Sequence, residues 1–295
     1  MRSTAPITGR LVELNDRRLW LHQSGEGGPV VVFLPGAGGM ALDYLLAHDL
    51  VAEFTTSVLY DRAGTGWSDD AELPRTLDEV TDELRNLLAT VGLSGPYVLV
   101  GHSLGGAYAQ RYAQRFPAET AAILLLDPLH ADYDNYMPDH LKLAANTTED
   151  VELPELTDEF VSQVRAVFAT SFGPLPEHVR EQVIDKHVSP ERLPTGLHEG
   201  LNVLALLEEL RAGGPLPDVP LIVLSGASVD ASQTMFQPEE LVREQVTASH
   251  VLYDAIAAKS PRGEHHSLPT AAHVTLPLTH PHAIATAVHT LIHQS

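Results

Sequence analysis

The chain has 295 residues, no cysteine and a formal net charge of −21, which arises from 39 acidic and 18 basic side chains. The absence of cysteine excludes disulfides, thiolate catalysis and cysteine-ligated metals. The negative charge disfavours nucleic acid and anionic membranes as partners, because lysine and arginine must neutralise the phosphates of both.

The first residues carry a single early arginine, Arg2, and lack the apolar core of roughly 7 to 15 residues that a signal peptide requires. We therefore expect a cytoplasmic protein. No uninterrupted apolar run in the sequence approaches the roughly 18 residues of a membrane span, so we expect no membrane partner.

Strand patterns begin directly after this segment. Residues 10–14 and 18–22 alternate apolar and polar side chains around a turn at Asn15-Asp16, which is typical of a β-hairpin. After Pro29 the strand-like runs become continuously apolar, as buried parallel strands are. These runs cover residues 30–34, 57–60, 97–100, 123–126 and 221–224.

Helical periodicity separates these strands. Leucine and valine recur at helical spacing over residues 76–91, and Thr76 with Glu79 forms a capping box at the start of this helix. A last helix is expected over residues 282–293. The alternation of buried strands with amphipathic helices predicts an α/β fold.

This alternation stops after Asp127 and resumes at Leu221. Three amphipathic segments fill the gap, at residues 156–170, 177–188 and 197–211. We expect one α/β core made of residues 1–128 and 216–295, with a helical cap formed by residues 129–215. A cap at this point would overhang the carboxyl ends of the strands, where ligands bind in open α/β sheets.

The pentapeptide Gly101-His102-Ser103-Leu104-Gly105 lies between the apolar run 97–100 and a helical stretch. A serine at such a strand-to-helix corner adopts a strained backbone conformation that exposes its hydroxyl, and the flanking glycines leave room for the tight turn. The pattern G-x-S-x-G in this context is typical of a nucleophile elbow. We therefore expect Ser103 to be a catalytic nucleophile.

Further motifs accompany the elbow. Residues 33–39 read Phe-Leu-Pro-Gly-Ala-Gly-Gly, residues 60–69 contain the pattern D-R-x-G-x-G-x-S, and an apolar strand ends at Gly226. With these motifs the chain resembles the α/β-hydrolase superfamily from about Gly9 to its C-terminus, in the serine-nucleophile branch with a helical cap. The resemblance implies a mostly parallel eight-stranded sheet with helices on both faces and a helical lid inserted after the sixth strand.

A serine hydroxyl is a weak nucleophile until a neutral imidazole accepts its proton and a carboxylate orients that imidazole. The resemblance implies His273 as this base, because Pro281 starts the final helix eight residues later, much as in the histidine loop of the family. His265 and His266 are the competing histidines, and we expect them on or near a short last strand.

The carboxylate of the triad has two candidates. The resemblance implies Asp230, which follows the strand that leads to Gly226. Asp127, at the end of the expected strand over 123–126, is the alternative, because some family members take their acid from that position.

Two backbone N–H groups must stabilise the oxyanion of the tetrahedral intermediate. The N–H of Leu104, at the start of the helix after the nucleophile, is one expected donor. The resemblance of residues 33–39 to the oxyanion loop of the family implies Ala37 as the second donor, with Gly38 as the alternative. The candidate substrate-binding side chains, which core packing explains equally well, are Met40, Tyr44 and Trp67.

We therefore predict a serine hydrolase that cleaves a carboxylic ester, a lactone or a related acyl bond of a small molecule through an acyl-enzyme. We expect no cofactor and no metal, because no H-E-x-x-H motif or equivalent accompanies the histidines. A serine at the elbow disfavours the epoxide-hydrolase and dehalogenase branches, which use aspartate there.

The same residues leave other functions open. Acyl transfer, perhydrolysis, C–C bond hydrolysis and lyase chemistry all occur on this fold, and a ligand-binding receptor with little turnover is a further alternative. Glu199, Glu208 and Glu209 leave open an aminopeptidase that recognises a free amine.

Overall fold

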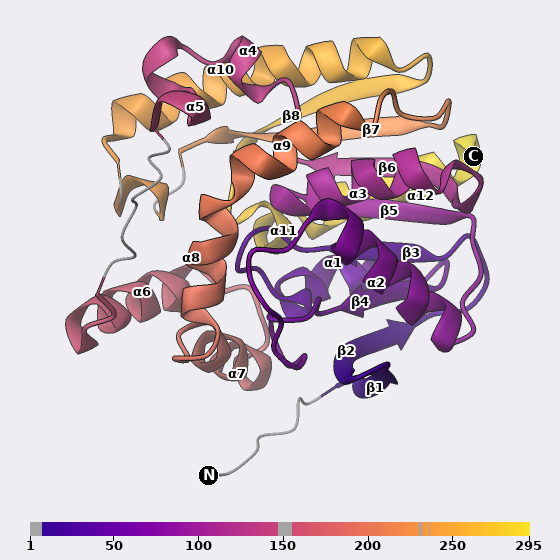
Figure 1. The fold of residues 1–295 in the computed structure, drawn as a ribbon, viewed down its shortest axis with the longest axis horizontal. Coiled ribbons are helices and arrows are strands. Elements are labelled where there is room, and N and C mark those ends of the chain that lie inside the picture. Colours follow the sequence, from indigo (N-terminus) through magenta and orange to yellow (C-terminus); the bar gives the residue numbers. More distant parts are fainter. Residues whose placement is uncertain (1–7, 147–154, 230–231, 236) are drawn as a thin grey trace.

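The computed structural model of the chain describes residues 8–146, 155–229, 232–235 and 237–295. Its centre is one eight-stranded sheet with the order β1-β2-β4-β3-β5-β6-β7-β8 (Figure 1). The strands are β1 (Arg10–Leu14), β2 (Arg17–Ser24), β3 (Val31–Leu34), β4 (Ser57–Tyr60), β5 (Tyr97–His102), β6 (Thr120–Leu126), β7 (Leu221–Ser228) and β8 (Gly263–Ala272). The pairs β1–β2 and β2–β4 are antiparallel and the other pairs are parallel, which confirms the expected mostly parallel sheet.

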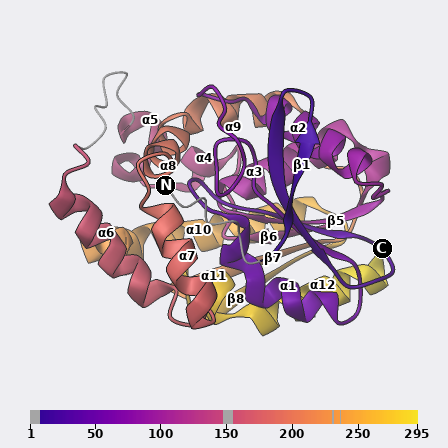
Figure 2. The ribbon, with the colours of Figure 1, turned by 90° about the horizontal axis from the view of Figure 1, so that it is seen from below.

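Helices cover both faces of this sheet. They pack against it as α1 (Leu45–Ala52), α2 (Leu77–Thr90), α3 (Leu104–Arg115), α10 (Glu239–Lys259), α11 (Leu276–Thr279) and α12 (Pro281–Gln294). Figure 2 shows α2 and α3 on one side of the sheet and α1 and α12 on the other. The expected helix over 76–91 is confirmed as α2, and its first turn contains the expected capping box of Thr76 and Glu79.

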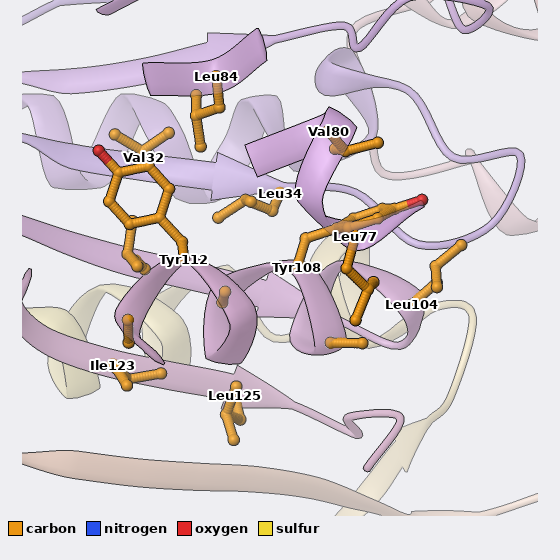
Figure 3. Close-up of a cluster of buried hydrophobic side chains, with 14 of the residues drawn as sticks. Val32, Leu34, Leu77, Val80, Leu84, Leu104, Tyr108, Tyr112, Ile123 and Leu125 are labelled. Atoms are coloured by element: carbon orange, nitrogen blue, oxygen red, sulfur yellow. The ribbon is translucent and has the colours of Figure 1, made fainter. Parts of the chain in front are cut away.

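Alternation along the central strands divides the apolar core into two layers, because successive side chains of a strand point to opposite faces. Val32 and Leu34 of β3 pack in one layer with side chains of α2 and α3. Figure 3 shows this layer around Tyr108. Val31 and Phe33 pack in the other layer, with α1 and α12. The two layers fix the sheet, and the carboxyl ends of its strands carry the candidate site.

The segment between β6 and β7 contains the remaining helices. They are α4 (Tyr133–Tyr136), α5 (Leu143–Asn146), α6 (Asp158–Ser171), α7 (Glu177–His187), α8 (Leu193–Leu201) and α9 (Val203–Ala212). Helices α6, α7 and α8 extend beyond the sheet (Figure 1), and we call them the outer helices. Helix α9 packs against α2 and α3, and Leu206, Leu207 and Leu210 join the core there, while Val183 and Ile184 of α7 pack in the other layer.

The helix expected over residues 197–211 is two helices, because α8 ends and α9 begins at Asn202. Asparagine disfavours helix interiors, since its side chain bonds to nearby backbone groups outside the helix. Here the Asn202 amide donates to the carbonyl oxygen of Arg75 at 3.3 Å. Among the described residues, no helix is long and apolar enough to cross a membrane.

Candidate active site

Ser103 occupies the corner between β5 and α3, with φ 52° and ψ −120°. The neighbouring glycines are required by close backbone contacts: a Cβ on Gly101 would collide with the carbonyl of Gly105, and a Cβ on Gly105 with that of Leu34. The corner is held by a hydrogen bond of 3.0 Å from the Ser103 N–H to the Leu126 carbonyl. Such surroundings maintain a backbone conformation that would otherwise be unfavourable.

His273 follows β8 and brings its imidazole to this serine. The distance from His273 Nε2 to Ser103 Oγ is 3.1 Å, which is a hydrogen bond. The competing histidines lie elsewhere on β8: His265 Nε2 is 2.7 Å from the hydroxyl of Ser225, and His266 pairs with Glu264. The geometry therefore places His273, of these three histidines, as the possible general base for Ser103.

A hydrogen-bonded relay behind the serine holds the histidine loop. His102 Nε2 lies 2.9 Å from the carbonyl oxygen of His273, and Tyr44 Oη lies 2.8 Å from His102 Nδ1. A carbonyl oxygen only accepts, so the Nε2 of His102 carries the proton and its Nδ1 accepts from the tyrosine hydroxyl. Burial lowers the pKa of His102 to about 3, which keeps this imidazole neutral. Sequence analysis missed this relay, because nothing local links residues so far apart.

Of the two candidate acids, Asp127 is the one that lies among the described residues. Asp230 lies outside the described residues. Asp127 has φ 40° and its carboxylate is buried. Both of its oxygens accept from the Gly226 N–H, at 3.1 and 3.2 Å, and its Oδ2 lies 3.7 Å from His273 Nδ1. That last distance is too long for a hydrogen bond, although it is within ion-pair reach.

The loop after β3 lies directly against the nucleophile, since a Cβ on Gly36 would come 3.1 Å from that of Ser103. Among the described residues, the N–H groups of Ala37 and Leu104 have no hydrogen-bond acceptor. The N–H of Gly38 instead donates to Glu199 Oε2 at 2.8 Å. In the described part of the chain these two backbone donors are thus without an acceptor, whereas the alternative donor, the N–H of Gly38, is already engaged.

Glu199 belongs to a buried ion pair that joins α8 to the sheet. Arg62, just after β4, donates from Nε and Nη2 to the two carboxylate oxygens of Glu199, at 2.7 and 2.5 Å. Burial opposes the charge of the guanidinium, but the adjacent carboxylate outweighs it, and the pKa of Arg62 is raised. Glu209 of α9 also uses its carboxylate to join the inserted segment to the core, because it accepts from the N–H groups of Leu77 and Asp78 at the start of α2.

A mainly apolar cavity of about 410 Å³ opens between the loop after β3 and the outer helices. We call it the apolar cavity. Ser103, His273 and Tyr44 line it from the sheet side. From the outer helices, and from Phe172 directly after α6, it is lined by Phe160, Val164, Val167, Phe168, His187, Leu193, Gly196 and Leu197.

A smaller cavity of about 180 Å³ lies on the other side of the same serine and histidine. We call it the polar cavity, because hydroxyl, amide and carboxylate groups contribute to its wall. They belong to Asp127, Tyr133, Gln233, Gln245, Ser249 and Tyr253. Ser103 and His273 line both cavities, so the two cavities meet at this serine and histidine.

The candidate substrate-binding side chains divide between cavity and core. Tyr44 borders the apolar cavity, although its hydroxyl is committed to His102. Met40 is 1% exposed and packs in the core layer with α1. Trp67 packs against the same layer, with its ring 5.8 Å from that of Trp20. Neither Met40 nor Trp67 is among the described residues that line the two cavities, and both pack as the alternative of core packing predicts.

Comparisons with known proteins agree with this architecture. The uncharacterized protein YbdG of Bacillus subtilis is 32% identical over 122 residues, which is 40% of this chain and 37% of that protein. The 2-hydroxy-6-oxo-6-phenylhexa-2,4-dienoate hydrolase of Burkholderia cepacia is 29% identical over 142 residues, or 44% of this chain and 49% of that enzyme. Each match thus spans less than half of the relative's length.

Among solved structures, the epoxide hydrolase VrEH1 from Vigna radiata has the same fold. It superposes with a TM-score of 0.74 at 16% identity, over 100% of both chains. The model of the alpha/beta hydrolase family matches residues 31–287. With this match over most of its length, the chain belongs to the α/β-hydrolase family.

Proposed function

We propose that the protein is a serine hydrolase that cleaves a carboxylic ester, a lactone or a related acyl bond. The observation that carries the proposal is the hydrogen bond of 3.1 Å between His273 Nε2 and Ser103 Oγ, at the junction of the two cavities. A hydroxyl paired in this way with an imidazole is an activated nucleophile.

In the proposed reaction, Ser103 Oγ attacks the acyl carbon while His273 accepts the hydroxyl proton. The N–H groups of Ala37 and Leu104 bind the resulting oxyanion. As the intermediate collapses, the bond to the leaving oxygen breaks and that oxygen takes the proton from His273. Water, deprotonated by the same histidine, then hydrolyses the acyl-enzyme and restores Ser103. We propose Asp230 as the carboxylate that orients His273, with Asp127 as the alternative.

The cavities indicate a neutral substrate with two unequal substituents. Among the described residues of the polar cavity there is no lysine or arginine, and Asp127 adds negative charge. Arg192 borders the apolar cavity, but it donates to three carbonyl groups between Gly64 and Ser68 and pairs with Asp70. These contacts disfavour a carboxylate-bearing substrate and favour an ester or lactone with an apolar arm and a small polar arm.

The related Burkholderia enzyme is named for a dienoate, so C–C bond hydrolysis is the alternative that the comparisons raise. The absence of a free cation in the described cavity walls argues against it for this chain. An aminopeptidase is also disfavoured, because the carboxylates of Glu199 and Glu209 are bonded to Arg62 and to the start of α2.

We further propose that the outer helices, a narrower segment than residues 129–215, form the lid of the site.

Labelling with a fluorophosphonate, followed by peptide mapping, tests the proposal together with a panel of short-chain, long-chain and lactone esters. We expect modification at Ser103 and multiple turnover. Ser103→Ala should lower kcat by roughly 10⁴-fold or more at unchanged thermal stability. Labelling without turnover would instead favour a transferase, a lyase or a receptor, and undiminished turnover by the variant would refute the assignment of Ser103.

A further inference from the structure

The buried pair of Arg62 and Glu199 does more than join two elements, because both side chains also bind the loop that carries Ala37. The side chains are 1% and 7% exposed. Besides its two bonds to Glu199, Arg62 donates from Nη2 to the carbonyl oxygen of Gly36 at 2.7 Å and from Nη1 to that of Pro35 at 3.1 Å. Glu199 Oε2 accepts from the N–H of Gly38 at 2.8 Å.

These contacts fix the two peptide groups on either side of Ala37. The N–H of Ala37 belongs to the same planar unit as the carbonyl of Gly36, and in a trans peptide the two point in opposite directions. Arg62 holds that carbonyl together with the Gly39 N–H, which donates to it at 3.1 Å, so the direction of the Ala37 N–H is set as well. The next peptide group contains the Gly38 N–H, and Glu199 holds it. A hydrogen bond from a cation to the Gly36 carbonyl also polarises the peptide and strengthens its N–H as a donor.

Glu199 reaches this loop from α8, one of the outer helices. The helix lies directly on the loop, since a Cβ built on Gly38 would come within 2.8 Å of Gly196 Cα, and a Cβ on Gly196 within 2.8 Å of Gly38 Cα. Only glycine at both positions permits this approach. The loop is therefore held by Arg62, which follows strand β4, and by the carboxylate of Glu199 on α8 of the inserted segment.

We propose that Arg62 and Glu199 are positioning residues that aim the Ala37 N–H at the oxyanion, so that the site is complete only while α8 is seated on the loop. The inference rests on the proposed function, because it assigns a role within the same acyl transfer to Ser103. It predicts that loss of the pair weakens binding of the transition state and leaves binding of the ground state nearly unchanged.

A trifluoromethyl ketone analogue of the best ester substrate tests this role. Ser103 Oγ adds to its carbonyl carbon, the hydroxyl proton passes to His273, and the new oxyanion occupies the same hole as the reaction intermediate. The ether isostere of the ester, which has no carbonyl, serves as the ground-state competitor. Inhibition constants for both compounds are measured with kcat and KM for each variant.

Glu199→Gln keeps an acceptor for Gly38 but loses the charge that matches Arg62. The double variant Arg62→Met with Glu199→Met removes the pair without leaving a buried charge unpaired, so it protects the test against simple unfolding. Glu209→Gln is the matched control, because it makes the same chemical change in the same inserted segment, at a carboxylate that binds the N–H groups of α2.

In Glu199→Gln we expect the ketone inhibition constant to rise, and kcat/KM to fall, by about 10- to 100-fold. Both changes should be larger in the double variant. Outright loss of an oxyanion donor costs about 10²–10³ in rate, so the effects should lie below or near that range. The ether constant should change less than about twofold and Glu209→Gln should resemble the wild type, since neither involves the oxyanion. Equal losses for ketone and ether, or wild-type ketone affinity in both pair variants, would overturn the proposal.

Hydrogen exchange separates this proposal from the proposed function. The amides of residues 36–39 should exchange faster in Glu199→Gln than in the wild type or in Glu209→Gln, whatever the reaction is. If the wild type fails to bind the ketone, the proposed acyl chemistry fails, while faster exchange at these amides would still support the pair as the support of the loop. Unchanged exchange would refute it.

Discussion

On the sheet side of the candidate site, Ser103 is held by backbone hydrogen bonds and by glycine contacts, whereas the outer helices are held mainly by side-chain contacts, both apolar and polar. Gly101 and Gly105 allow the elbow, and the Leu126 carbonyl binds its N–H. On the other side, Glu199 pairs with Arg62, and His187 of α7 pairs with Asp43 at 2.9 Å.

The difference indicates that the two regions respond differently to substitution. The nucleophile depends on close packing within the sheet, which tolerates no added atom. The outer helices are held by side chains: Val183 and Ile184 of α7 pack in the core layer of α1 and α12, and polar pairs such as that of Glu199 and Arg62 add contacts near the site. We therefore expect substitutions on the sheet side to abolish the chemistry or the fold, and substitutions on the other side to change rate and selectivity.

The largest expected effect distinguishes the two acids. Asp230→Asn should lower kcat by about 10⁴-fold, as loss of the acid does in other triads. Asp127→Asn should lower it far less, because the nearest oxygen of Asp127 is 3.7 Å from His273 Nδ1. The two variants make the same chemical change, so steady-state kinetics on one ester compares them directly. The reverse order would assign the acid to Asp127.

The next effect is a loss of stability in acid that arises in the core. Burial lowers the pKa of His48 to about 3 and that of His130 to about 4, as it does for His102. The unfolded chain, with pKa values near 6.5, then binds more protons than the native state between about pH 4 and 6.5. The free energy of unfolding should therefore fall as the pH drops below about 6.5, by up to about 1.4 kcal/mol per pH unit for each histidine.

Asp61 opposes part of this slope. Burial raises its pKa to about 6, so the native state binds more protons than the unfolded chain between about pH 4 and 6, and its contribution to stability falls as the pH rises through that range. Urea titrations at pH 7.5, 6.5 and 5.5 measure the sum. The fall in the free energy of unfolding between pH 7.5 and 5.5 should be smaller by about 1.4 kcal/mol in His48→Gln, because one buried imidazole is gone. An unchanged slope would show that this histidine is not the source.

A glycine pair compares the tolerance of the two regions directly. Gly105→Ala should destabilise the protein by about 1–3 kcal/mol, because the new methyl group meets the backbone carbonyl of Leu34. Gly200→Ala on α8 meets nothing within 4 Å and should stabilise the helix by up to about 1 kcal/mol. Thermal denaturation of both variants tests the contrast, and similar losses would contradict it.

The smallest effect concerns selectivity. Phe168→Ala on α6 should enlarge the apolar cavity and shift the ratio of kcat/KM for bulky over short esters by about tenfold, with little change in kcat for the short ester. Phe54→Ala is the control, because that side chain is 39% exposed and lines neither cavity. If both variants keep the wild-type ratio, the apolar cavity does not hold the substrate.

Local patterns in the amino-acid sequence were sufficient to predict several features of the molecule. The buried strands, the capping box of α2 and the elbow around Ser103 were predictable, because side-chain period, cap chemistry and backbone sterics act over a few residues. The motifs also indicated the α/β-hydrolase fold. The break at Asn202 was missed, although asparagine is a known helix-terminating signal.

Which distant groups meet could not be predicted from local patterns and follows from the folded arrangement. Ser103 and His273 are 170 residues apart, and Arg62 and Glu199 are 137 apart. The relay from Tyr44 through His102 and the burial of Met40 likewise depend on how the two layers close over the sheet. Contacts at such separations leave no local period in the sequence, because packing and charge pairing become specific only after the chain has folded.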